Sequence, residues 1–236
     1  MPIGLRGMMR LEIAATEMIV LAIDTSGSGC SAAIYDSGSS AVLGQSGADI
    51  GRGHAERLME FVDEALVAAD RPIGDIDRIA VTIGPGSFTG IRVGVATARG
   101  LALALGKPAV GISSLHVIAE EARSAAPGKS VLVAIDAKRD EVYVQAYDAA
   151  GHAVTEPEAL SVTVARDRFA GFEGCVAGSG AELLASLTPV KTPDLVDIAV
   201  VARLGVIADP ASAKPKPLYL RGPDAKPQAG FAVARA

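Results

Sequence analysis

The chain has 236 residues, of which 50% are hydrophobic and only 4% aromatic, so any core is built mainly from aliphatic side chains. This length suits one large domain or two small ones. A formal net charge of −5 argues against a broad basic surface, so if the chain contacts RNA we expect a partner to supply most of the binding. The two cysteines, Cys30 and Cys175, lie far apart and no Cys-x-x-Cys pair exists, which argues against a disulfide framework or a zinc site.

Residues 1–17 form the first distinct segment. Arginine and glutamate residues interrupt it, so it lacks the apolar stretch of a secretory signal. We expect either a disordered extension or translation that begins at Met8, Met9 or Met18. The apolar run at 18–23 is too short to span a bilayer, and we therefore expect a cytoplasmic protein.

Two segments of the chain repeat one pattern. Residues 19–36 read IVLAIDTSGSGCSAAIYD and residues 131–148 read VLVAIDAKRDEVYVQAYD, and they align without a gap. Each predicts a buried strand that ends in Ala-Ile-Asp, a turn, and a second strand that ends in Tyr-Asp. Matching periodicity over the same length indicates an internal duplication. The identical pairs are Ala22/Ala134, Ile23/Ile135, Asp24/Asp136, Tyr35/Tyr147 and Asp36/Asp148.

Each copy opens a series of strands and helices, which predicts an α/β protein with two lobes around mixed sheets flanked by helices. After the second hairpin we expect a strand and a glycine turn within 172–184. The tail from Asp209 is expected to be extended, with residues 217–221 packed on the body. The elements expected after the first hairpin are strands at 41–45, 77–83 and 109–111 and helices at 55–69, 89–105 and 114–124. The expected units are an N-terminal lobe at 18–127, a C-terminal lobe at 128–220 and a tail at 221–236.

The loop IGPGSFTG, residues 83–90, joins a predicted strand to a predicted helix and resembles a phosphate-binding loop. It lacks the Gly-Lys-Ser/Thr of a P-loop and the spacing of a dinucleotide fingerprint. Two interpretations stay open: a tight strand-to-helix joint, or an anion site at the helix N-terminus. The candidate nucleotide or loop residues are Asp24, Ser26, Gly84, Gly86, Ser87, Thr89 and Asp136.

The two helices around this loop carry more apolar and small residues than one buried stripe needs. Gly90, Gly94, Ala98 and Ala102 recur at every fourth position, and the helix at 55–69 is apolar over several faces. Either this row packs against the chain's own sheet, or the two helices bind a partner. We predict a partner interface, formed by Arg57, Leu58, Phe61, Val62, Ala65, Gly90, Val93, Gly94, Thr97 and Ala98.

The sequence contains no strong catalytic signature. None of its three histidines, His54, His116 and His152, belongs to a helical pair that could hold a metal. A G-x-S-x-G nucleophile motif is also missing. Asp24 and Asp136 end strands where a nucleotide-binding lobe would hold magnesium, but turn formation explains an Asp there equally. We therefore predict neither catalytic nor metal-binding residues.

Several stretches together resemble the bacterial TsaB (YeaZ) family, in the order in which that family shows them. They are IVLAIDTS, HAERLMEFVDEAL, the long segment at 77–119 and PLYLRGPDAKPQ, so the resemblance extends from about Met18 to Gln228. It implies a duplicated actin-like, Hsp70-like (ASKHA) fold, in agreement with the repeat. Family labels of the M22 glycoprotease kind are also attached to such proteins.

The resemblance also implies a function. TsaB-like proteins are the non-catalytic partner of TsaD, which forms N6-threonylcarbamoyladenosine next to the anticodon of tRNAs that read ANN codons. A TsaE-like ATPase joins the complex, a homodimer forms in isolation, and tRNA is met only through the complex. TsaD-like proteins carry two metal-binding histidines where Ser114 and Ile118 stand here. The resemblance thus implies a scaffold subunit without a resident cofactor, with weak or interface-dependent binding of ATP or ADP and Mg²⁺ left open.

The alternative is an actin-like nucleotide-binding enzyme, such as an ATPase or an M22 glycoprotease-like metallopeptidase. It would bind nucleotide through Asp24, Asp136 and the glycine turns at 84–90 and 178–180.

Overall fold

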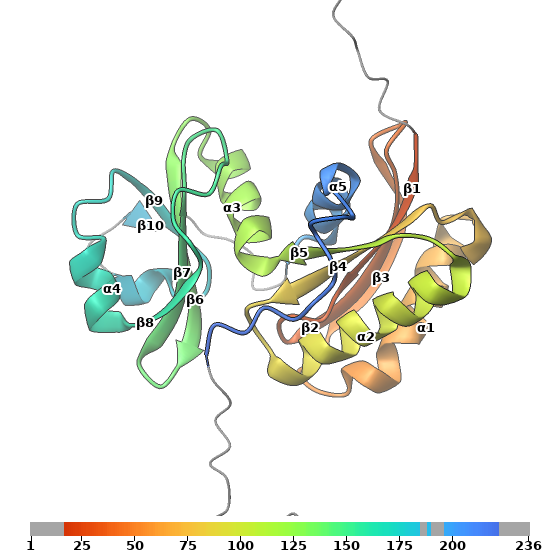
Figure 1. Ribbon diagram of the computed structural model, residues 1–236, viewed down its shortest axis with the longest axis horizontal. Coiled ribbons are helices and arrows are strands. Elements are labelled where there is room, and N and C mark those ends of the chain that lie inside the picture. The colour runs from red at the N-terminus through yellow and green to blue at the C-terminus, as the bar shows by residue number, and fades with distance from the viewer. Residues whose placement is uncertain (1–16, 185–187, 190–195, 222–236) are drawn as a thin grey trace, which may run out of the picture.

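Two five-stranded mixed sheets, each flanked by helices, form two lobes (Figure 1). The computed structural model describes residues 17–184, 188–189 and 196–221. Strand order is β3-β2-β1-β4-β5 in the first sheet and β10-β9-β6-β7-β8 in the second. The helix α3 (Ser114–Ala125) lies between the two sheets in the view of Figure 1.

The first sheet combines an antiparallel meander with a parallel pair. β1 pairs antiparallel with β2 and parallel with β4, and β3 and β5 form the edges. A bulge between Ile34 and Tyr35 shifts the register of β2 against β3. The strands are β1 (Ile19–Asp24), β2 (Gly29–Asp36), β3 (Ala41–Asp49), β4 (Arg78–Gly84) and β5 (Ala109–Ser113).

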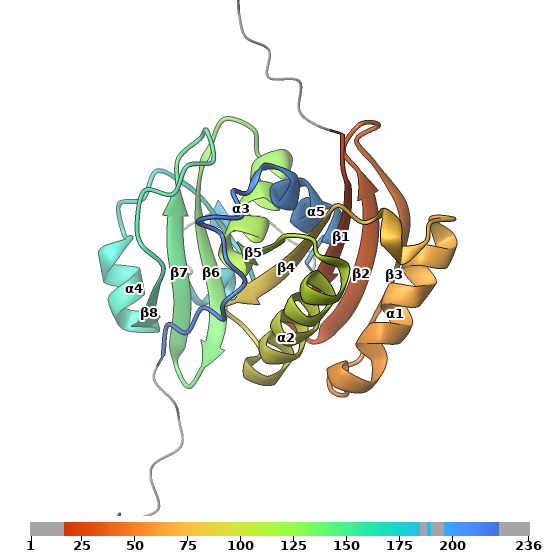
Figure 2. The same cartoon turned by 45° about the vertical axis from the view of Figure 1, so that its right-hand side comes forward.

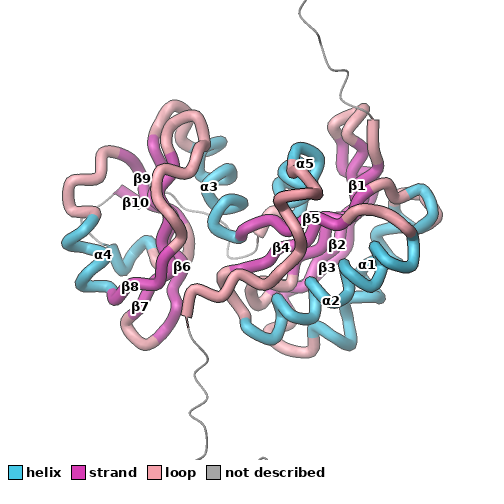
Figure 3. The backbone as a smooth tube through the Cα atoms, in the orientation of Figure 1, coloured by secondary structure: helices cyan, strands magenta, loops and turns pink. Residues whose placement is uncertain are grey.

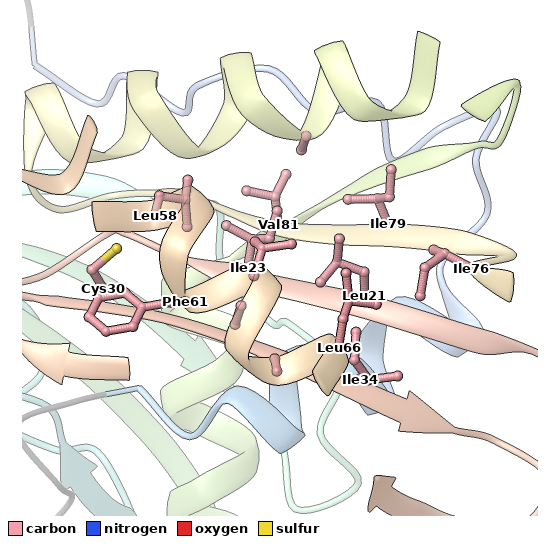
Figure 4. Close-up of a cluster of buried hydrophobic side chains, with 14 of the residues drawn as sticks. Leu21, Ile23, Cys30, Ile34, Leu58, Phe61, Leu66, Ile76, Ile79 and Val81 are labelled. Atoms are coloured by element: carbon pink, nitrogen blue, oxygen red, sulfur yellow. The ribbon is translucent and has the colours of Figure 1, made fainter. Parts of the chain in front are cut away.

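Helices cover both faces of this sheet (Figure 3). On one face α1 (His54–Ala68) and α2 (Phe88–Leu105) form a core with β1, β2 and β4, part of which is drawn in Figure 4. On the other face α5 (Ile198–Ile207) packs against the alternate side chains of β1 and β4. Burial on two faces explains the continuous apolar run of β1, because neither side of the strand meets solvent.

The second sheet has the same plan with smaller helices. α4 (Val162–Arg168) and the 3₁₀ turn η2 (Ala181–Leu184) cover one face, and α3 covers the other. A further 3₁₀ turn, η1 (Ile73–Asp75), precedes β4 in the first lobe. The strands are β6 (Ser130–Lys138), β7 (Glu141–Tyr147), β8 (Glu158–Ser161), β9 (Gly174–Ala177) and β10 (Thr188–Pro189).

The predicted duplication and two-lobed α/β class are confirmed. In each lobe a hairpin, β1–β2 or β6–β7, pairs with a third antiparallel strand on one side and a parallel strand on the other. The predicted helices lie within one residue of their observed bounds, whereas the strand expected at 41–45 continues to Asp49. The sequence analysis named no elements for β8, α4, β10 or α5.

Helix α5 belongs to the second half of the chain but packs on the first sheet. Asp197 caps its start, because the Asp197 carboxylate accepts a 2.9 Å hydrogen bond from the Ala199 N–H. At its end, Arg78 Nη1 donates to the carbonyls of residues 205, 206 and 208, each at 2.9 Å. A cation there complements the helix dipole. The division of the chain at 127/128 stays a prediction. Helix α5 follows that boundary in sequence but packs on the first lobe.

Residues 209–221, which we call the strap, run from α5 past the first sheet to the second. The Gly111 N–H donates to the Ala213 carbonyl and the Leu218 N–H donates to the Ile83 carbonyl, each at 2.8 Å. Arg221 then pairs with Glu141 of β7. The predicted packing of residues 217–221 on the body is thus confirmed. Residues 1–16 of the predicted extension at 1–17 and residues 222–236 of the predicted tail at 221–236 lie outside the described residues.

Candidate functional site

The glycine loop after β4 binds the chain's own backbone. The Ser87 N–H donates to the Ser26 carbonyl at 2.6 Å, and a Cβ on Gly86 would overlap that same carbonyl. Ser87 caps α2, since its Oγ accepts a 3.2 Å hydrogen bond from the Gly90 N–H. Gly84 needs its glycine for a left-handed φ of 93°. In this structure the loop is therefore a joint that locks the end of β1 to the start of α2.

Asp24 is the most buried acidic residue of this region, at 3% exposure. Its Oδ1 accepts hydrogen bonds from the hydroxyls of Thr82 at 2.6 Å and Ser26 at 2.7 Å and from the Ser26 N–H at 3.1 Å. Burial raises the pKa of Asp24, although these hydrogen bonds oppose the rise. The residue therefore organises the turn after β1 and faces a cavity of ≈ 510 Å³.

This cavity lies between the first sheet and the N-terminus of α5. Its lining is polar on the sheet side, with Ser31, Gln45 and Ser46, and contains the α5 cap Asp197. Nearby Glu121 of α3 accepts a 2.7 Å hydrogen bond from the Asp197 N–H, and burial raises the pKa of Glu121 to about 7. Among the residues that the structure describes, no group of three potential ligands is arranged to hold a metal ion.

Asp136 occupies in β6 the position that Asp24 occupies in β1, but in different surroundings. Its carboxylate accepts hydrogen bonds from the N–H and the Nζ of Lys138, at 2.7 and 2.6 Å. The hydrogen bond from the Lys138 side chain lowers the pKa of Asp136. Its own N–H donates to Ser179 Oγ at 3.1 Å. Over the described ranges no hydrogen bond or ion pair joins Asp24 to Asp136, and Asp136 is not among the residues that line the cavity beside Asp24.

Of the other candidate loop residues, the structure brings Ser26, Gly84, Gly86 and Ser87 together around the end of β1. Thr89 is exposed on the first turn of α2. The assignment of these residues to nucleotide binding stays a prediction.

Most of the predicted interface residues lie in the chain's own core. Gly94 is the clearest case, because a Cβ there would overlap Thr25 Oγ1. The Thr25 hydroxyl in turn donates to the Gly90 carbonyl at 2.8 Å. The small-residue row thus packs on the chain's own sheet, which is the first of the two interpretations that the sequence left open for it. The buried residues are Leu58, Phe61, Val62, Ala65, Gly90, Gly94 and Ala98.

The remaining three residues of that prediction lie nearer the surface. Arg57 is exposed and pairs with Glu60 at 2.6 Å, whereas Val93 and Thr97 are half-buried. A partner interface on α1 and α2 stays a prediction. In the structure the residues available to form it point outward from the two helices, and they were not among those predicted.

These outward faces are apolar and open. Met59 and Val67 of α1 are 41% and 81% exposed, and Leu103 of α2 is 86% exposed. A second row of small residues, Ala96, Gly100 and Ala104, is exposed along α2, and no atom lies within 4 Å of a Cβ built on Gly100. Another helix could approach α2 closely along this row.

The exposed faces of the two helices differ in charge. The exposed residues of α1 include Glu56, Glu60, Asp63 and Glu64, whereas α2 contains Arg92 and Arg99 and no acidic residue. Met59 and Val67 line a surface hollow of ≈ 600 Å³ together with acidic side chains of α1.

Among the described helices α2 alone is long and apolar enough, by composition, to cross a membrane. Here it packs on β4 and β1 through its small-residue row.

A cluster that the sequence analysis missed lies where the strap meets α2. The Arg92 guanidinium stacks on Phe88 at 3.7 Å from the ring centroid, and Arg92 Nε donates to the Tyr219 hydroxyl at 2.7 Å. The rings of Phe88 and Tyr219 lie 5.6 Å apart. The i, i+4 spacing of Phe88 and Arg92 was a usable signal, but the third member lies 127 positions from Arg92.

Comparison with known proteins gives matches over most of the chain. Residues 48–173 match the family model described as "TsaD: tRNA N6-adenosine threonylcarbamoyltransferase". An uncharacterized protein of Mycobacterium tuberculosis H37Rv is 36% identical over 94% of this chain and 99% of its own length. The tRNA threonylcarbamoyladenosine biosynthesis protein TsaB of Escherichia coli K12 is 37% identical over 55% of each chain.

Solved structures agree with these matches. The structure described as YeaZ from Pseudomonas aeruginosa superimposes with a TM-score of 0.71 at 28% identity, over 86% of this chain and 100% of its own. A second P. aeruginosa structure, described as an uncharacterized protein similar to peptidase YeaZ, gives 0.73 at 29% identity with the same coverage. The duplicated actin-like fold is therefore confirmed.

Proposed function

Because this chain belongs to the TsaB/YeaZ family, whose TsaD-like domain it carries, we propose that it serves in the formation of threonylcarbamoyladenosine in tRNA. In this proposal it is a non-catalytic cytoplasmic subunit that binds and supports a TsaD-like transferase. The transferase modifies the adenosine next to the anticodon of tRNAs that read ANN codons. A TsaE-like ATPase joins the complex, and tRNA is bound within it.

The absence of a catalytic role is supported by the residues at the start of α3. TsaD-like proteins have two metal-binding histidines there, and this chain has Ser114 and Ile118. Ser114 is buried at the first position of α3, and Ile118 packs against the core of the second lobe. His116 between them stacks on Tyr147, with 5.7 Å between ring centroids. None of these side chains reproduces a histidine pair.

The docking role is supported above all by the open small-residue row of α2. Ala96, Gly100 and Ala104 would let a partner helix lie close to the α2 backbone, while Met59 and Val67 on the neighbouring α1 supply apolar area. The acidic α1 and basic α2 favour a partner that presents a basic helix to α1 and an acidic helix to α2. A second copy of this chain meets that requirement, so the proposal includes a homodimer of the isolated chain.

Co-purification with the TsaD-like protein of the same cell tests this proposal. We expect Gly100→Glu to abolish the complex, because it places a charge in the open row without touching the core. Gly171→Glu is the matched control, since Gly171 is also exposed with no atom within 4 Å of its Cβ position. Normal binding by Gly100→Glu, or equal loss by both variants, would contradict the docking surface.

The alternative, an actin-like nucleotide-binding enzyme, is favoured only by the cavity beside Asp24 in a two-lobed fold. Calorimetric titration with ATP and Mg²⁺ distinguishes the two functions. Tight binding by the isolated chain together with ATP turnover would support the enzyme.

A further inference from the structure

Two stretches of this acidic chain contain no acidic residue. Residues 78–119 and 210–221 hold seven of the 22 Lys and Arg residues and none of the 27 Asp and Glu residues. The remaining residues therefore carry all of the negative charge. Such segregation in sequence matters only if the two stretches also meet in space.

The fold places them side by side. The second stretch is the strap without its first residue, Asp209, and it is hydrogen-bonded to β5 through the Ala213 carbonyl and to β4 through the Leu218 N–H. Figure 2 shows the strap passing between α2 and the second lobe. Residues more than 100 positions apart thus form one continuous surface without carboxylates of its own.

Four cations of this surface are exposed: Arg92 and Arg99 on α2, and Lys214 and Lys216 on the strap. Within the part of the chain that the structure describes, none of the four forms an ion pair. The other cations of the two stretches are engaged elsewhere. Arg78 caps α5, Lys107 pairs with Asp77 at 3.2 Å, and Arg221 pairs with Glu141.

Two aromatic rings stand among these cations. Phe88 and Tyr219 are 51% and 49% exposed, in a chain of which only 4% is aromatic. Arg92 stacks on Phe88 and holds the Tyr219 hydroxyl, so both rings are fixed while half of their surface stays open. We call Phe88, Arg92, Lys214, Lys216 and Tyr219 the acid-free face; Arg99 is next to Gly100 and belongs with the docking row of α2.

We propose that the acid-free face binds RNA, with its cations on the phosphodiester backbone and its rings available to stack on an unpaired base. Phosphates match uncompensated Lys and Arg side chains, and planar rings beside a guanidinium are the usual platform for single-stranded bases. An acidic protein partner would pair with the cations, but its carboxylates would not stack on the half-exposed rings of Phe88 and Tyr219. The proposal rests on the proposed function, which makes the RNA a tRNA held alongside the partner.

The test is a fluorescence anisotropy titration of a labelled tRNA anticodon stem–loop with the full isolated chain across a salt series. We expect the wild type to bind at low salt, and the double variant Lys214→Glu/Lys216→Glu to bind at least about tenfold more weakly. The slope of log affinity against log salt should fall by about 2, one for each lost phosphate contact. These lysines lie on the strap, away from the docking row of α2.

The matched control is Arg52→Glu/Lys129→Glu, which changes the net charge equally at two exposed positions outside both stretches. It should retain most of the affinity. Absent binding by the wild type, an unchanged affinity in the strap variant, or equal losses in both variants would overturn the inference. Loss of co-purification with the TsaD-like protein, with RNA affinity unchanged, would show instead that the strap docks a protein. Because co-purification and anisotropy are read separately, failure of one proposal is distinguishable from failure of the other.

Discussion

Helix α2 carries two rows of small residues, and the comparison between them explains how this fold combines tight packing with an open surface. The inner row, Gly90, Gly94 and Ala98, lies against Thr25 and β4 and leaves no room for larger side chains. The outer row, Ala96, Gly100 and Ala104, has the same four-residue spacing but is exposed, and no atom of the described residues lies within 4 Å of a Cβ built on Gly100. Small residues at the same spacing therefore serve close packing on one side of the helix and accessibility on the other.

The largest difference between the rows should come from a charge. Gly94→Glu would place a carboxylate and two methylene groups where Thr25 and Val81 stand, and we expect it to cost about 4 kcal/mol or more of the free energy of unfolding. Gly100→Glu should change that free energy by less than about 1 kcal/mol, since the side chain enters solvent. Chemical denaturation followed by circular dichroism measures both.

Burial likewise limits what a charge substitution at Val62, a residue of the predicted partner interface, can show about partner binding. Val62 is completely buried, so this substitution would remove a partner through unfolding and not through the interface itself. A Gly94→Glu or Val62→Glu variant with wild-type stability would contradict the burial on which the comparison rests.

The sequence predicted those parts of the fold that depend on local pattern. The repeated hairpin was visible because both copies keep Ala-Ile-Asp and Tyr-Asp at equal spacing, and α1 and α2 were visible from their periodicity. Packing of residues 217–221 was also predicted, and the hydrogen bond from the Leu218 N–H to the Ile83 carbonyl confirms it.

The inward or outward direction of a helix face could not be predicted in this way. Rows at 90, 94, 98 and at 96, 100, 104 have equal spacing, and only the position of Thr25, 65 residues before Gly90, determines which row is buried. Asp24 and Asp136 both follow Ala-Ile, yet Asp24 is buried and accepts a hydrogen bond from Thr82, 58 positions away, whereas Asp136 pairs with its near neighbour Lys138. Contacts across such separations leave no trace in local pattern.

The opposite face of the first sheet offers a contrast that pH should reveal. The contact of Gly94 with Thr25 contains no titrating group, whereas Glu121 supports the start of α5 beside Asp197 and near Asp24. Burial raises the pKa of Glu121 from 4.5 to about 7, so the folded chain binds more protons than the unfolded chain between these values. The stability linked to Glu121 is fully present below pH 4.5 and is lost as pH rises through about 7.

Glu121→Gln should remove this part of the pH dependence, because the amide does not titrate. Urea unfolding at pH 5 and at about pH 8 measures it, and the wild type should lose more stability over that interval than the variant. Asp24, whose pKa is also raised, is present in both proteins and cancels in the difference. Parallel profiles for the two proteins would show that Glu121 does not titrate in this range.

The smallest expected effect sharpens the comparison most, because one substitution should act with opposite sign on the two rows. Gly94→Ala adds a methyl group that overlaps the Thr25 hydroxyl, and we expect a net loss of about 1–2 kcal/mol even after the gain in helix propensity. Gly100→Ala meets open space, and the lower entropy of the unfolded chain should stabilise the protein by about 0.5–1 kcal/mol. Both values come from matched urea titrations. A stabilising Gly94→Ala would mean that β1 and α2 separate easily enough to admit a methyl group. The inner row would then not be tightly packed, and the contrast between the two rows would be wrong.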